Sequence, residues 1–136
     1  MNKHEVWPIC REVAEKQSLD PYLIMAIIEQ ESNYDKYARR LEQGFFRRYT
    51  EPANMDEVSE VLLAVSWGLM QTMGESLRAL GFFGDDTAVN STVASMALSR
   101  YLADPKWQIE CGCEWYKKKL ALAGGNIRLA LLKWNG

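Results

Sequence analysis

The stretch PYLIMAIIEQES, residues 21–32, indicates a buried helix that ends in two carboxylates. No polar residue occurs between Leu23 and Ile28, whereas the helix of a protein surface would show one every three or four positions. We therefore expect other helices to surround this one. At least one of the two acids, Glu29 and Glu31, is expected to emerge at the edge of the core.

Helical periodicity continues on both sides of this stretch. Asp20 is suited to cap the helix with Pro21 at its first position, and Asp104 with Pro105 repeats that start signal. No β-alternation persists long enough to predict a sheet. The expected fold is therefore all-α, one domain over residues 1–136 with about six or seven helices and an irregular insertion at about 33–64. Beyond the helix over 21–32, helices are predicted along the first residues, over 56–64, from Ser66 as a cap through WGLMQTMGESLRALGF, over 91–102, over 105–122 and from near Asn126.

The composition restricts the class of protein. The 136 residues are 48% hydrophobic and 25% charged, which is typical of a soluble globular chain with a real core. The net charge of −2 argues against general nucleic-acid binding, and no apolar run approaches the roughly 20 residues that span a bilayer. Three cysteines predict no disulfide framework, and the CGC motif at 111–113 points its two thiols about 200° apart on a helix. We expect no metal and no cofactor.

Four segments, in order, resemble the transglycosylase SLT domain, the helical, goose-type lysozyme-like fold of enzymes that cut peptidoglycan. DPYLIMAIIEQES resembles the segment that carries the catalytic Glu-Ser pair of the family, and SWGLMQTMGESLRALG is similar to its Gly-Leu-Met-Gln signature. DPKWQIECGCEWY resembles its Asp-Pro helix, and LALLKWNG its Ala-Tyr-Asn-Ala-Gly strip, with Trp134 in the place of the tyrosine. The likeness covers residues 19–136, and RRLEQGFFRRY resembles phage and prophage members.

The resemblance assigns the catalytic acid to Glu31. The residues alone leave Glu29 as an alternative, because it lies about 200° around the same helix. Ile24, Ile27 and Ile28 precede Glu31 by seven, four and three positions, and so share its face. Burial against such apolar side chains disfavours the charged form of a carboxyl and raises its pKa, as a general acid requires.

Seven further residues are candidates for binding the substrate, some of them with a second interpretation. Met70 and Met73 suit a groove or the core equally, and Ser66 is first a helix cap. Glu42 is either a loop residue or a second carboxylate across the groove. Trp134 can stack on a sugar and donate through its indole N–H, but it cannot accept a hydrogen bond. The complete set is Gln71, Met70, Met73, Trp134, Asn135, Glu42 and Ser66.

The resemblance implies a lytic transglycosylase in which Glu31 acts first as general acid and then as base, forming a 1,6-anhydro product. A hydrolytic goose-type muramidase, with Glu42 assisting water, is the alternative, and an inactive glycan-binding or structural phage component is the third. The expected partner is the peptidoglycan glycan strand, bound by a monomer without nucleic acid or membrane insertion. No signal peptide is visible, so we expect synthesis in the cytoplasm and action on the cell wall, as for a phage product.

Overall fold

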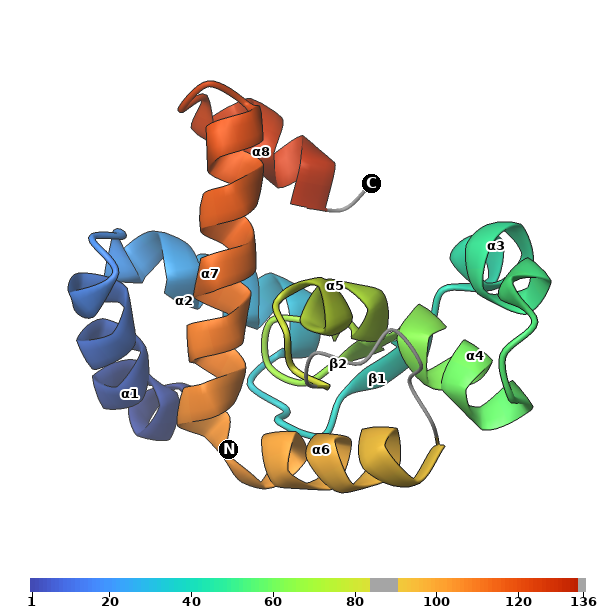
Figure 1. The fold of residues 1–136 in the computed structure, drawn as a ribbon. Coiled ribbons are helices and arrows are strands. Elements are labelled where there is room, and N and C mark those ends of the chain that lie inside the picture. Colours follow the sequence, from blue (N-terminus) through green and yellow to red (C-terminus); the bar gives the residue numbers. More distant parts are fainter. Residues whose placement is uncertain (84–90, 135–136) are drawn as a thin grey trace.

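The computed structural model describes residues 1–83 and 91–134, which form a mainly helical molecule with one small sheet (Figure 1). The all-α class is therefore confirmed. The described residues contain eight α-helices against the six or seven expected, and one of them, α3, is a single turn. In chain order the elements are α1 (Lys3–Lys16), α2 (Pro21–Ser32), β1 (Arg39–Leu41), α3 (Gln43–Phe45), the π-helical turn η1 (Phe46–Thr50), the 3₁₀ turn η2 (Glu51–Ala53), α4 (Glu57–Ala64), β2 (Val65–Trp67), β3 (Thr72–Met73), α5 (Gly74–Ala79), α6 (Ser91–Ala103), α7 (Pro105–Leu122) and α8 (Ile127–Trp134).

The two Asp-Pro signals start helices where the sequence predicted them. The Asp20 side chain accepts a hydrogen bond from the backbone N–H of Tyr22 at 2.9 Å at the start of α2. The Asp104 side chain accepts one from Trp107 at 3.1 Å at the start of α7. Each side chain satisfies a backbone donor that has no partner within its helix, so these boundaries follow from local chemistry.

Helix α2 lies in the larger of two hydrophobic clusters, together with residues of α1, α7 and α8. Ile24 and Ile28 are completely buried there, as the apolar run predicted. The second cluster joins α4, β2, α5 and α6 around Leu63, Leu77 and Tyr101. No helix of the described residues is both long and apolar enough to cross a membrane.

The prediction of a helix that begins after Ser66 is wrong. Residues 65–73 form a hairpin of β2 and β3, and α5 begins only at Gly74. The turn of this hairpin has left-handed backbone at Gly68, with φ of 75°, and at Gln71, with φ of 51°. A Cβ on Gly68 would stand 2.3 Å from Oε1 of Gln108 on α7, so a long-range contact requires glycine here.

Strand β1 completes an antiparallel sheet in the order β1-β2-β3, in which Arg40 pairs with Ser66 and Ser66 with Met73. Only β1 lies in the segment expected to be irregular, whereas β2 and β3 follow it. Strands of two or three residues are too short to show an alternating pattern in the sequence. Figure 1 shows α3 and α4 at the far end of the molecule from α1 and α2, with the sheet and α5 between them. Residues 43–64, from α3 to α4, thus extend the molecule beyond the sheet.

Candidate active site

Glu31 lies in the last turn of α2 and is half-buried, whereas Glu29 is exposed. Burial raises the pKa of the Glu31 carboxyl above its ordinary value, and the negative charge of Glu42 adds to this effect. The positive charge of Arg40 and a hydrogen bond with the Trp134 side chain lower the pKa again, but the net direction is upward. The fold therefore distinguishes the two acids, because Glu31 is half-buried with a raised pKa and Glu29 is exposed.

Glu31 opens onto a pocket of about 450 Å³, a size typical of ligand sites. The structure brings five of the seven predicted binding residues to this pocket. They are Glu42, Ser66, Gln71, Met73 and Trp134. Sequence reasoning missed several other lining residues, chiefly Arg40, Phe45, Glu75, Trp115 and Lys119.

The pairing of the three strands explains why three of these side chains lie together. Arg40, Ser66 and Met73 are directly opposite one another across β1, β2 and β3. Side chains opposite each other in a sheet lie on the same face, and here all three line the pocket. One face of the small sheet is therefore one wall of the site.

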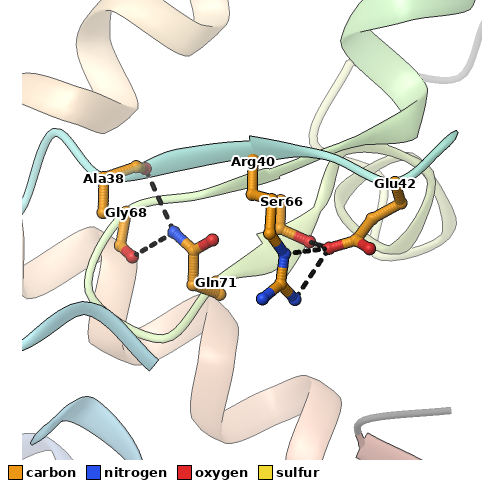
Figure 2. Close-up of polar contacts among 6 residues, drawn as sticks. All are labelled: Ala38, Arg40, Glu42, Ser66, Gly68 and Gln71. Carbon is orange, nitrogen blue, oxygen red and sulfur yellow. Dashed lines mark hydrogen bonds and ion pairs between the residues drawn. The ribbon is translucent and has the colours of Figure 1, made fainter. Parts of the chain in front are cut away.

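Glu42 follows β1 and is held in place by this wall. Its Oε1 accepts hydrogen bonds from Oγ of Ser66 at 2.9 Å and from Nε of Arg40 at 2.9 Å, and Arg40 also forms an ion pair with it (Figure 2). Ser66 is thus a donor to Glu42 within β2 and caps no helix, which corrects its first interpretation. Glu42 is a second carboxylate in the pocket, and one of its oxygens is fully engaged.

Gln71 closes the hairpin turn with its amide. Its Nε2 donates to the carbonyl oxygens of Ala38 at 3.1 Å and Gly68 at 3.0 Å, which ties the turn to the segment before β1 (Figure 2). Its Oε1 has no hydrogen-bond donor among the described residues. Because Gln71 lines the pocket, this oxygen is available to accept a hydrogen bond from a ligand.

Two buried polar contacts hold the pocket walls together behind these residues. Ser32, next to Glu31, donates from Oγ to the carbonyl oxygen of Leu69 at 2.8 Å. Oε1 of Gln108 accepts from the backbone N–H of Leu69 at 2.8 Å, and its Nε2 donates to the carbonyl oxygens of Lys36 and Tyr101. Gln108 is completely buried. The signal that sequence reasoning did not use was a glutamine among the buried positions of α7, beside Ile109 and Gly112.

Two of the seven predicted binding residues, Met70 and Asn135, are not among the described residues that line the pocket. Met70 is completely buried and touches the α7 backbone at Gly112, so of its two interpretations the structure favours the core. Asn135 lies outside the described residues. Tyr116 is also buried, and its ring meets Trp134 edge-on with centroids 6.4 Å apart. Within residues 1–83 and 91–134, no cluster of histidine, cysteine or acidic side chains is placed to hold a metal ion.

Comparison with known proteins yields one match, to the family model described as Transglycosylase SLT domain, over residues 8–136. This match includes α2, the whole sheet and both helices that carry the pocket's tryptophans. No curated protein and no solved structure matches the chain.

Proposed function

The chain belongs to the transglycosylase SLT family, and on this premise we propose that it cleaves the β-1,4 bond between N-acetylmuramic acid and N-acetylglucosamine in peptidoglycan. Membership points to lytic transglycosylase activity on peptidoglycan in general. The bond that is cut, the anhydro product and the roles of the residues are our proposal.

In the proposed reaction, one carboxyl acts twice. Glu31 donates its proton to the glycosidic oxygen, the bond from that oxygen to C1 breaks, and positive charge develops on the muramic acid ring. The resulting Glu31 carboxylate then takes the proton from the 6-hydroxyl of the same ring while that oxygen bonds to C1. The products are a free 4-hydroxyl and a 1,6-anhydro end, and Glu31 is protonated again.

The observation that carries this proposal is the environment of Glu31. A half-buried carboxyl with a raised pKa retains its proton at a higher pH than an exposed one, so it can act as a general acid. Arg40 and Trp134 favour the charged form, which suits the second step. Trp134 differs from the tyrosine of the family motif, yet its indole N–H still supplies a donor for the carboxylate.

Glu42 bears on the choice between transglycosylation and hydrolysis. Its Oε1 accepts hydrogen bonds from Ser66 and Arg40, which position the carboxylate, and its Oε2 is the oxygen that would take a proton from water in a hydrolytic reaction. We place transglycosylation first because the 6-hydroxyl of the substrate can close on C1 without a second carboxylate. Oε1 of Gln71 would accept from an acetamido N–H or a hydroxyl, and Trp134 would stack on a sugar ring.

The test is mass spectrometry of the fragments released from purified sacculi. We expect 1,6-anhydro ends from the unaltered protein and a loss of about 10²–10⁴-fold in rate from Glu31→Gln, because the variant has no proton to donate. Glu29→Gln is the matched control and should keep full activity. Reducing ends would instead identify a hydrolytic muramidase. The absence of any fragment, with strands still bound, would identify a glycan-binding component without catalysis.

A further inference from the structure

A second pocket, of about 360 Å³, lies beside the first, toward the insertion. We call it the insertion pocket, and its walls include Phe45, Tyr49, Met55, Glu75 and Arg78. Phe45 and Glu75 line both pockets, so the two share a wall. The two pockets therefore adjoin one another at Phe45 and Glu75.

Two aromatic rings form one side of this pocket. Phe45 and Tyr49 are four residues apart along α3 and the π-helical turn, and their ring centroids are 4.8 Å apart. The Tyr49 side chain is largely exposed, at 57%. An exposed aromatic face beside a hollow can cover the apolar C–H face of a sugar, while the phenol hydroxyl bonds at the edge. π-Helical turns also occur frequently at functional sites.

The lining also includes a charge pair, Glu75 and Arg78, that is neutral overall. Nε of Arg78 donates to Oε2 of Glu75 at 2.8 Å, and a second guanidinium nitrogen contacts the other carboxylate oxygen. The pair offers donors and acceptors together, as hydroxyl and acetamido groups require. Because the pair carries no net charge, its chemistry suits the hydroxyl and acetamido groups of a saccharide.

We propose that the insertion pocket binds a further saccharide unit of the same glycan strand, next to the units in the catalytic pocket. This inference depends on the proposed function, because it takes the same polymer as the ligand. Its consequence is that the insertion makes binding sensitive to strand length: only a strand long enough to reach past Phe45 gains the contacts with Tyr49 and Arg78.

The test is binding to peptide-free glycan strands, long and short, in a Glu31→Gln background, so that its outcome does not depend on turnover. We expect Tyr49→Ala to weaken binding of long strands about tenfold, the effect of losing one aromatic stacking contact, and to leave short strands unchanged. Tyr37→Ala is the matched control, since Tyr37 is similarly exposed and lines neither pocket.

Equal losses for long and short strands, or no loss for either, would overturn the inference. A loss that appears only when stem peptides are still attached would also overturn it and identify a peptide as the occupant. Failure of the proposed function has a different signature, the absence of anhydro ends from digested sacculi, and leaves the binding comparison intact.

Discussion

Ser32 and Leu69 are joined by a hydrogen bond of 2.8 Å from the serine hydroxyl to the leucine carbonyl oxygen, although 37 positions separate them. The contact fastens the end of α2, which carries Glu31, to the hairpin turn that ends at Gln71. The acid and the amide of the pocket therefore hold a constant relative position. This gives a physical reason for the serine that follows the catalytic glutamate in the family motif.

We expect Ser32→Ala to lower kcat more than it raises KM, because it loosens the acid without removing a group that contacts substrate. Unfolding free energy should fall by about 1 kcal/mol, measured in urea. Ser99→Ala is the matched control. Among the described residues, the Ser99 hydroxyl donates to the carbonyl oxygen of Ser95 in its own helix and has no partner outside it. Ser32 makes the equivalent bond to Ile28 within α2, so the two variants differ in the contact with Leu69. Equal activity of the two variants would contradict a positioning role.

Arg40 and Glu42 should move the pH profile in opposite directions. In the proposed mechanism activity requires protonated Glu31, so we expect kcat/KM to fall as pH rises through the pKa of this group. Arg40→Gln removes a charge that lowers this pKa and should shift the fall to higher pH. Glu42→Gln removes a charge that raises it and should shift the fall to lower pH. Arg39→Gln is the control, since Arg39 lies next to Arg40 but lines no part of the pocket. Shifts of the same sign would refute this assignment.

Trp134→Phe should shift the fall of kcat/KM with rising pH to higher pH. The substitution keeps an aromatic ring but removes the N–H that favours the Glu31 carboxylate and lowers its pKa. Trp134→Tyr, which supplies a hydroxyl donor, should return the profile toward the original. An unchanged pH profile of kcat/KM in Trp134→Phe would contradict a hydrogen bond from Trp134 to the Glu31 carboxylate.

Glu31→Gln should stabilise the protein at neutral pH. Burial raises the pKa of Glu31 in the folded chain above its ordinary value of 4.5. Between this value and the raised pKa of the folded chain, the folded state binds more protons than the unfolded state. The free energy of unfolding therefore falls as pH rises through this range. We expect a higher Tm than that of the unaltered protein at pH 7 and no difference well below pH 4.5. Glu29→Gln, at an exposed position, should change Tm at neither pH.

Gln108→Leu should cost about 3 kcal/mol of unfolding free energy, measured in urea. The leucine fits the space approximately, but it leaves the N–H of Leu69 and the carbonyl oxygen of Lys36 without a partner. The carbonyl oxygen of Tyr101 loses one of its two donors and keeps the N–H of Asp104. Gln30→Leu, on the exposed side of α2, is the control and should stay within about 0.5 kcal/mol. An unfolding free energy of Gln108→Leu close to that of the unaltered protein would show that water replaces these hydrogen bonds.

Several features of this protein could be predicted because their causes are local. Asp-Pro pairs start α2 and α7, since capping and the fixed φ of proline act within one turn. The apolar run of α2 is buried because no polar residue interrupts it. The same periodicity placed Glu31 on the face of Ile24 and Ile28, and the structure finds that carboxyl half-buried with a raised pKa.

Other features depend on contacts between distant segments. The hairpin at residues 65–73 was mistaken for a helix start because its left-handed turn follows from the approach of Gly68 to Gln108, which lies 40 positions away. Met70 could not be assigned to groove or core from spacing alone, since both faces of a segment this apolar look alike. Arg40 and Trp115 lie in segments that resemble the family but had no role assigned to them, and Lys119 lies in no motif. All three became pocket residues only when folding brought α7 beside the sheet.

By itself, then, the sequence determined most of the helices, the starts of α2 and α7, and the acid at the end of a buried helix. Tertiary structure decided which side chains face that acid, that Ser66 holds Glu42, and that a second pocket adjoins the first. The reason is range: capping and periodicity act over a few residues, whereas burial, charge and pocket shape around Glu31 depend on segments that meet only when the chain has folded.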